Sequence, residues 1–265
     1  APGGVVHVRL GIYDELNGEI FPLLLPTGVH LAGPAASRIT GNRPMIVGRG
    51  DTSDDFPVDE RATLVMGADS TVSALHLMDP GGFGFASVIL VPFPSATIHS
   101  CVIEQGPRGI MVLHEAVDVV IRDTHVSGAG IGILFAGAGQ GSLVERTTTR
   151  GNSTGVVISD LVPDVDLGGG AQSSEGRNVI AGNTRLDLGV YDGNVVSAQS
   201  NYWDGIPDPS EYVGMFFEGA PGTDIWLQGN QAAVDTSGAL SAEPPSGGPV
   251  SPLPAPDQGT TSAGS

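Results

Sequence analysis

Charged residues that could do chemistry recur near one position of a repeating sequence pattern. Ser100, Asp123 and Glu145 follow one another at intervals of 23 and 22 residues, with Arg122 directly before Asp123 and Arg146 directly after Glu145. Two carboxyl groups held close together beside arginines could act as the acid and nucleophile of a glycosidase, or could bind calcium. We therefore take Arg122, Asp123, Glu145 and Arg146 as the candidate catalytic residues. The alternative, which we favour, is an exposed ladder of charges in which the arginines balance the acids.

Ligand binding is the second chemistry that the residue types suggest. His99 lies one place before Ser100, and Tyr202 and Trp203 belong to a C-terminal region where aromatic residues gather. Exposed aromatic rings offer flat apolar faces on which sugar rings can stack. We therefore take His99, Tyr202 and Trp203 as the candidate ligand-binding residues. The alternative for the aromatic region, which we favour, is a cap that covers the apolar core and the free strand edges at one end of the fold.

Metal and cofactor chemistry finds little support in the sequence. Cys101 is the only cysteine, so an intrachain disulfide and a thiolate metal cluster are excluded, and we expect a small buried residue. His114 and His125 lack the short spacings of histidine metal ligands. The acidic stretch at residues 51–60 lacks the D-x-[DN]-x-[DN]-G frame of a calcium loop. The sequence thus predicts no metal site and no cofactor, and calcium is the one ion left open.

The overall charge excludes several classes of partner. The chain has 29 Asp and Glu against 11 Lys and Arg, for a net charge of −18, and all of its basic residues are arginines. A surface this negative repels phosphate groups, so we expect no binding to nucleic acid. The absence of lysine also excludes a lysine base or Schiff base. No apolar run approaches the ~18 residues that a membrane helix needs, so we expect no membrane insertion.

An internal repeat determines how these residues can be positioned. Residues 96–113, 119–136 and 142–159 can be aligned with one another. Such self-similarity, at a period of 22–23 residues, is the mark of a solenoid. Two columns of the alignment define the repeat, an apolar one of Ile98, Ile121 and Leu143 and a glycine one of Gly109, Gly132 and Gly155.

The short segments of each repeat predict strands and not helices. They lack the 3.6-residue periodicity of a helix, and corners rich in Gly, Ser, Thr, Asn and Asp separate them. Strands that coil so that each turn pairs with the next form a parallel β-helix, in which inward side chains stack on like side chains. Further strands are expected at residues 5–10, 28–31, 45–47, 62–65, 71–77, 87–91, 178–180, 186–190 and 194–197.

Two stretches resemble the first and last rungs of a known group of proteins. In the second stretch, residues 194–205, Asn201, Tyr202 and Trp203 form the centre of the motif. In the first stretch, residues 5–33, the matching residues are His7, Val8, Gly11, Tyr13, Glu19, Pro22, Pro26, Gly28, Val29, Leu31 and Gly33. Both resemble an uncharacterised family of secreted bacterial right-handed parallel β-helix proteins in the pectate-lyase-like superfamily. The resemblance implies extracellular, periplasmic or cell-surface residence and a carbohydrate context, and it supplies no catalytic residues.

The resemblance leaves open whether the protein is an enzyme. Pectin-hydrolysing glycosidases with this fold typically carry N-T-D, G-H-G and R-x-K elements. Neither N-T-D nor G-H-G occurs in the chain, and R-x-K cannot occur without lysine. Because a fold by itself does not establish an activity, the enzyme class is not assigned from the resemblance.

The chain divides into a solenoid and a tail. We expect a single-domain all-β protein, a right-handed parallel β-helix with a capping segment over residues 1–230, and a disordered Pro/Gly/Ser-rich tail or linker over residues 231–265. The start at Ala1 leads us to expect an exported bacterial protein whose signal has been removed. The function that we favour is a non-catalytic extracellular module that binds a polysaccharide or cell-surface glycan, or that has a structural role at the surface. The alternatives are a polysaccharide lyase or glycoside hydrolase acting on an extended polymer, and adhesion or self-assembly through the solenoid ends.

Overall fold

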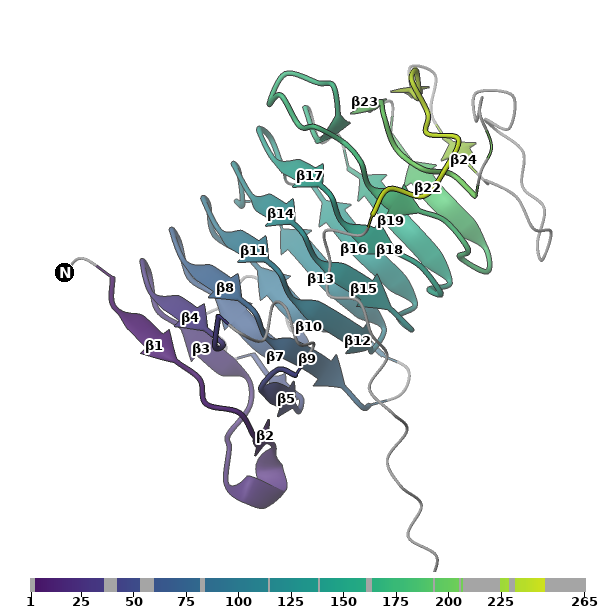
Figure 1. The fold of residues 1–265 in the computed structure, drawn as a ribbon. Coiled ribbons are helices and arrows are strands. Elements are labelled where there is room, and N and C mark those ends of the chain that lie inside the picture. Colours follow the sequence, from purple (N-terminus) through teal and green to yellow (C-terminus); the bar gives the residue numbers. More distant parts are fainter. Residues whose placement is uncertain are drawn as a thin grey trace, which may run out of the picture.

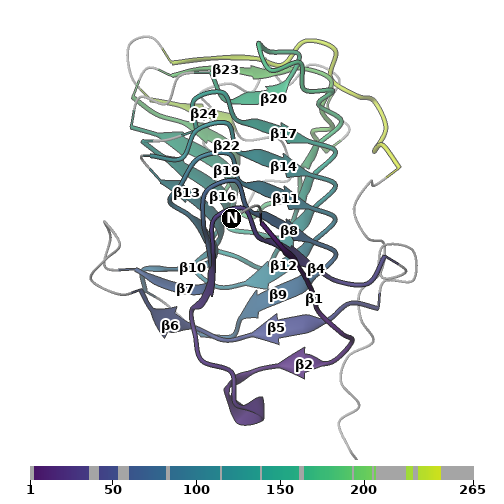
Figure 2. The ribbon, with the colours of Figure 1, turned by 90° about the vertical axis from the view of Figure 1, so that its left-hand side faces the viewer.

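The strands of the chain wind into a right-handed parallel β-helix. The computed structural model describes residues 3–35, 42–52, 60–81, 84–113, 115–137, 139–160, 164–192, 194–204, 206, 225–228 and 232–245. Within this part, one strand pair is antiparallel and the others are parallel, and the only helix is the 3-10 turn η1 (Glu15–Asn17). Figure 1 and Figure 2 show the rungs stacked along one axis, with β1 and β2 at one end and β23 and β24 at the other. The prediction of an all-β solenoid is confirmed.

Three sheets form the sides of the solenoid. Sheet A consists of β1 (Val5–His7), β4 (His30–Ala32), β8 (Thr71–Ser73), β11 (Thr97–His99), β14 (Val120–Arg122), β17 (Leu143–Glu145), β20 (Asp166–Gly168), β23 (Val195–Ala198) and β25 (Ala233–Asp235). Sheet B consists of β2 (Ile12–Tyr13), β5 (Met45–Val47), β9 (His76–Asp79), β12 (Val102–Gln105), β15 (His125–Ser127), β18 (Thr148–Thr149) and β21 (Val179–Ile180). Sheet C consists of β3 (Leu23–Leu25), β7 (Arg61–Met66), β10 (Ala86–Val91), β13 (Arg108–Leu113), β16 (Ile131–Ala136), β19 (Thr154–Ser159), β22 (Leu186–Val190) and β24 (Ile225–Leu227), with β6 (Gly50–Asp51) antiparallel to β7.

Consecutive rungs in the middle of the solenoid are 23 residues apart. Ile98 pairs with Ile121, and Ile121 pairs with Val144, and all three side chains are buried in the core. The predicted apolar column is therefore correct for its first two members and wrong by one residue for the third. Leu143 pairs instead with Val120, and because side chains alternate along a strand, it points away from the core.

The predicted glycine column is confirmed and has a steric cause. Gly109, Gly132 and Gly155 each lie one residue into a strand of sheet C. A Cβ atom on Gly109 would lie 2.6 Å from the carbonyl oxygen of Gly132, and one on Gly132 would lie 2.5 Å from that of Gly155. A side chain at any of these positions would force neighbouring rungs apart.

The corner between sheets A and B requires a left-handed backbone. Ala74, Ser100, Asp123 and Arg146 occupy it in successive rungs, with φ values of 55°, 56°, 49° and 47°. Residues other than glycine rarely adopt this conformation. Each of these residues donates its N–H group to a carbonyl of the next rung, which offsets the strain. The corner at Ala74 divides the strand predicted at residues 71–77 into β8 and β9.

A ladder of polar side chains lies inside this corner in the later rungs. The side chain of Asn178 accepts from the N–H of Thr147 at 2.9 Å and donates to the carbonyls of Val144 and Leu167 at 3.0 and 2.8 Å. Asn201 repeats the arrangement one rung later, because its Oδ1 accepts from the N–H of Asn178 at 2.9 Å. Buried backbone groups that the turn leaves unpaired are thereby satisfied.

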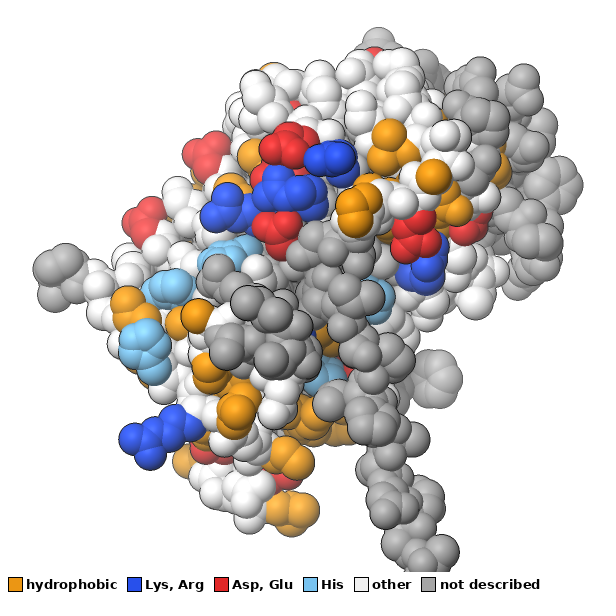
Figure 3. Space-filling view, in the orientation of Figure 1, with side chains coloured by type: hydrophobic (Ala, Val, Ile, Leu, Met, Phe, Trp, Pro, Cys, Tyr) orange, Lys and Arg blue, Asp and Glu red, His pale blue; other side chains and the backbone are white. Residues whose placement is uncertain are grey.

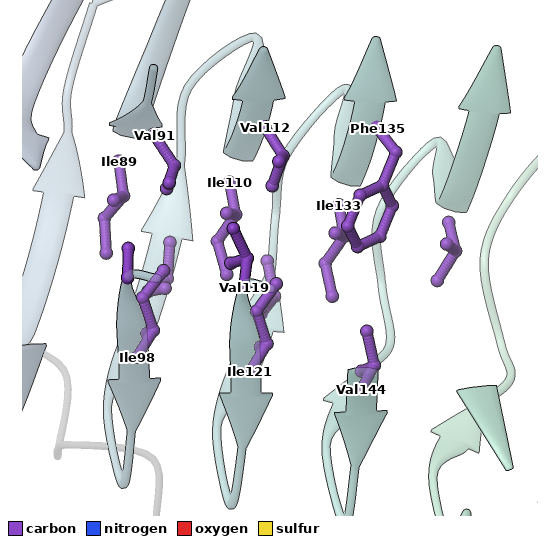
Figure 4. Close-up of a cluster of buried hydrophobic side chains, with 14 of the residues drawn as sticks. Ile89, Val91, Ile98, Ile110, Val112, Val119, Ile121, Ile133, Phe135 and Val144 are labelled. Atoms are coloured by element: carbon purple, nitrogen blue, oxygen red, sulfur yellow. The ribbon is translucent and has the colours of Figure 1, made fainter. Parts of the chain in front are cut away.

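Apolar columns from sheets A and C fill the centre of the solenoid. Figure 4 shows Ile110 and Val112 of β13 facing Val119 and Ile121 across the interior. These four side chains are completely buried, and they belong to the main core cluster. Burial of such columns is the principal stabilising contribution to a solenoid, since each rung contacts only its neighbours.

Sheet C is apolar on its outer face as well. Val65, Leu90, Met111, Leu134 and Val157 form an outward column, and all of them are buried in a second cluster. A sheet that is covered on both faces reads as a nearly continuous apolar run, and in β10 all six residues are buried and only Ser87 is polar.

The solenoid continues past residue 230, where we expected the tail to begin. β25 pairs with β23 in sheet A, and Leu240 forms a parallel bridge with Tyr202. Residues 232–245 thus add a further partial rung. Residues 246–265, the rest of the expected tail, lie outside the described residues.

Candidate functional site

Three of the four candidate catalytic residues, Asp123, Glu145 and Arg146, meet at the corner between sheets A and B. The guanidinium group of Arg146 contacts Asp123 at 2.8 Å, Glu145 at 3.0 Å and Glu175 at 3.4 Å. A second contact of 3.2 Å to Asp123 makes that pair bidentate. Arg146 thus joins three carboxylates, two of which the sequence had placed here. Glu175 was missed because it follows a longer loop that breaks the 23-residue spacing.

The register corrects the predicted column of Ser100, Asp123 and Glu145. Ser100 and Asp123 share the left-handed corner position, but the next residue in that column is Arg146. Glu145 lies one place earlier and pairs with Arg122 in the ladder. The predicted alignment used 22 residues for its second interval, whereas the structure has 23. The third member of each predicted column, Leu143 or Glu145, is therefore one residue too early.

The electrostatics of this corner support the ladder of balanced charges. The hydrogen bond to Asp123, together with the nearby carboxylates, raises the pKa of Arg146 above its ordinary value, although partial burial opposes the shift. Both oxygens of Asp123 are engaged by this one arginine. The carboxylates therefore serve as ion-pair partners in this arrangement.

Arg122 and His99 extend the cluster along the outer face of sheet A. Arg122 is exposed and forms no ion pair within the part of the chain that the structure describes. The ring of His99 lies 6.2 Å from that of His30, centroid to centroid, and its Nδ1 lies 3.4 Å from the hydroxyl of Ser100. Figure 3 shows arginines, acids and histidines gathered on this face of the molecule.

The two aromatic candidates have different surroundings. Trp203 is completely buried in the main core, so its indole offers no exposed face to a sugar. This corrects the expectation that Trp203 binds a ligand and assigns it to the end of the core. Tyr202 is half-buried and bridges Val179 and Leu240 through its backbone.

A pocket on the outer face of sheet C was not predicted. Its volume is about 620 Å³. It lies over the outward side chains of β16, β19 and β22. Its apolar wall consists of Pro107, Ile131, Val157, Leu186 and Tyr191. Its polar groups come from Ser153, Thr154, Ser159, Arg185, Asp192 and Gln228.

The absence of a side chain at Gly189 leaves room for the ring of Tyr191 at this pocket. A Cβ atom on Gly189 would lie 2.9 Å from Cε2 of Tyr191, so the ring lies directly over the backbone of β22. Gly189 pairs with Val157 on one side and Trp226 on the other. The sequence signal for the site is a glycine in an outward strand position with an aromatic residue two places later. The 22–23-residue repeat does not show which strand positions face outward, so the repeat alone could not reveal this signal.

Sheet B carries a third group of titratable side chains. Nε2 of His76 lies 2.9 Å from Oε2 of Glu104, and His125 follows on the next strand. The bond to His76 lowers the pKa of Glu104, and burial lowers the pKa of His125. In the described ranges, no cluster of three or more His, Cys, Asp or Glu side chains could hold a metal ion. Cys101 is buried, as expected.

The fold and these sites define the protein as a parallel β-helix protein with an ion-paired corner and a separate pocket on sheet C. Residues 1–210 match the family described as "Protein of unknown function (DUF1565)", and the chain belongs to this family. The prediction of an uncharacterised β-helix family is confirmed. No curated protein sequence is similar enough to this chain to count as a match.

Solved structures with a similar fold are distant in sequence. Pectate lyase Pel9A is 10% identical with a TM-score of 0.45, over 91% of this chain and 70% of the other. The A-module of the Azotobacter vinelandii mannuronan C-5 epimerase AlgE4 is 16% identical with a TM-score of 0.32, over 89% of this chain and 90% of the other. The A-module of AlgE6 from the same organism is 15% identical with a TM-score of 0.33, over 91% of each chain. At such identities and TM-scores, the likeness says nothing about the activity of this chain.

The described residues contain no helix with the length and apolar character needed to cross a membrane.

Proposed function

We propose that the protein is a non-catalytic carbohydrate-binding module and that the pocket on sheet C is its binding site. The observation that supports the proposal is the pocket itself, whose volume of about 620 Å³ lies within the usual range of ligand sites. A site of this size accepts one or two sugar rings of a longer chain. Exported residence, which the sequence resemblance implies, is part of the proposal.

The lining of the pocket matches the chemistry of a sugar ring. A sugar has an apolar face of C–H groups and a rim of hydroxyl groups. Tyr191 and Val157 supply apolar surface at the floor, and the ring of Tyr191 can stack on the C–H face. Arg185 and Gln228 stand at the exposed rim, where they can bond to hydroxyl or carboxylate groups.

The distribution of carboxylates supports binding without hydrolysis. Glycosidases use two carboxyl groups on opposite sides of the scissile bond. Among the described residues that line the pocket, Asp192 is the only acid. The other carboxylate cluster lies at the corner of sheets A and B, where Arg146 engages Asp123 and Glu145.

The test is affinity electrophoresis and calorimetry against a panel of neutral and uronate polysaccharides. Tyr191→Ala should weaken binding about tenfold or more, because the loss of ~1.4 kcal/mol of stacking and apolar contact corresponds to a factor of ten. Tyr13→Ala is the matched control, since it removes a half-buried tyrosine in the first rung, away from the pocket, and it should bind as the unaltered chain does.

Two results would overturn the proposal. Full retention of a bound polymer by Tyr191→Ala would remove the pocket from consideration. Release of unsaturated products or reducing ends from any polymer, with or without calcium, would refute a non-catalytic role. If that release were lost in Asp123→Ala, the active site would lie at the corner of sheets A and B.

A further inference from the structure

The N-terminal end of the solenoid is apolar and exposed. Nine large hydrophobic side chains are exposed among the described residues, and seven of them lie between Val5 and Leu24 in the first rung. Leu16 and Ile20 are the extremes, at 96% and 85% exposed. Figure 3 shows hydrophobic side chains at this end of the molecule. A concentration of apolar surface on this scale marks an interaction site.

The first rung also presents free strand edges. β1, β2 and β3 are the terminal strands of sheets A, B and C, and Figure 2 shows β1 and β2 at this end. Gly4 and Val8 bond to β4 through their backbone groups. Because such groups alternate along a parallel strand, those of Val5 and His7 face the free edge. Unpaired N–H and C=O groups along a strand edge are a template for pairing with another strand.

We propose that a second copy of this chain covers this end, with N-terminal rung against N-terminal rung. An occupant must supply apolar contacts and strand edges on three sides at once. Another end of the same fold has this shape. Among the residues that the structure describes, the last rung offers no such apolar surface, because its exposed residues, such as Ala233, Asp235 and Ser237, are small or polar.

The proposed contact has two-fold symmetry and closes on itself. A two-fold axis perpendicular to sheet A would place β1 antiparallel to β1 of the second copy and would extend the sheet across the interface. A contact in which both copies use the same surface yields a dimer and not a filament. The interface would leave the pocket on sheet C outside the contact, so this inference is independent of the proposed binding function.

The apolar surface available is of the size that a stable interface uses. Burying a whole Val, Leu or Ile side chain removes roughly 100 Å² of apolar surface from water. Seven such side chains, each half to fully exposed, therefore offer roughly 450 Å². A standard interface buries about 800 Å² on each partner, a little over half of it apolar.

The test begins with the mass of the full 265-residue chain by sedimentation equilibrium. The expected mass is twice 26.9 kDa. Because each copy carries a net charge of −18, salt should strengthen the association by screening the repulsion. Leu16→Asp and Ile20→Asp should each shift the dimer toward monomer by tenfold or more in the dissociation constant. Val195→Asp, at an apolar residue that is 66% exposed near the other end, should leave the mass unchanged.

A cross-link tests the orientation independently of stability. The native Cys101 is buried, so a surface cysteine would be the reactive one. Val5→Cys should form a disulfide-linked dimer on mild oxidation, and Val195→Cys should not. A monomer at all concentrations, a dimer unaffected by Leu16→Asp, or filaments that cross-link Val5→Cys to Val195→Cys would each overturn the proposal. Capture of a different protein by this end, without self-association, would also overturn it.

Discussion

Replacement of Asn178 by alanine tests the account of the interior polar ladder. The side chain is 1% exposed and makes three hydrogen bonds, one as acceptor and two as donor. Its removal affects the three backbone groups unequally. The carbonyl of Val144 keeps the hydroxyl of Ser174 at 2.9 Å, and the carbonyl of Leu167 keeps the amide of Asn201 at 2.9 Å.

The loss of stability expected for Asn178→Ala depends on which backbone groups keep a hydrogen-bond partner. The N–H of Thr147 bonds only to Asn178 within the described residues, so its burial without a partner costs ~1–3 kcal/mol. The two carbonyls lose one bond each, at ~0.5 kcal/mol apiece, and the small cavity costs ~1 kcal/mol more. We expect a loss of about 3–5 kcal/mol in the free energy of unfolding.

The assay is urea unfolding followed by circular dichroism. With a denaturant dependence of ~3 kcal/mol per molar, the midpoint should fall by about 1–1.7 M. Asn178→Asp separates hydrogen bonding from volume, because it keeps the size and the acceptor but sets a carboxylate oxygen against the carbonyls of Val144 and Leu167. It should cost at least as much as alanine at pH 7. The exposed Asn42→Ala is the control. An aspartate variant as stable as the unaltered chain would refute the reasoning.

Three further predictions concern other parts of the molecule. Burial lowers the pKa of His125 from 6.5, so the unfolded chain binds the proton more tightly, and the free energy of unfolding should fall as the pH is lowered from above 6.5. His125→Asn should flatten the dependence of the melting temperature on pH between about 8 and 5, and an unchanged slope would contradict the assignment. Gly132→Ala should cost ~2 kcal/mol or more through its clash with Gly155, whereas Gly4→Ala, which has open space, should be neutral in the same urea assay. Asp123→Ala should cost ~1 kcal/mol or less because its pair with Arg146 is about one-quarter exposed, and a larger loss in urea unfolding would assign the corner a major structural role.

The sequence repeat predicted the architecture because equivalent residues stack in a parallel β-helix. The glycine column could be read directly, since it stems from a backbone contact that no other residue tolerates. The apolar column could not be placed to one residue at Leu143 and Val144, where two apolar neighbours fit equally well. Only the pairing of Leu143 with Val120 decides which side chain faces inward.

Other features depend on structure that the repeat does not encode. The corner at Ala74 has φ +55°, and nothing about an alanine signals a left-handed turn. The asparagine ladder left a trace, because Asn178 and Asn201 are 23 residues apart, but the longer loop before Asn178 hid its alignment with Thr147. The pocket on sheet C requires knowledge of which outward residues are covered, and this depends on contacts between distant segments.

The constant interval between β11, β14 and β17 makes each rung a unit of length. Deletion of residues 120–142 would join Val119 to Leu143, and Val144 would then stack directly on Ile98 in place of Ile121. The solenoid would shorten by ~4.8 Å, the spacing of one rung, and the remaining core side chains would still stack in register. Duplication of the same segment would lengthen it by the same step. Recombination within the gene can thus adjust the reach of the protein in fixed increments, without any redesign of its interior.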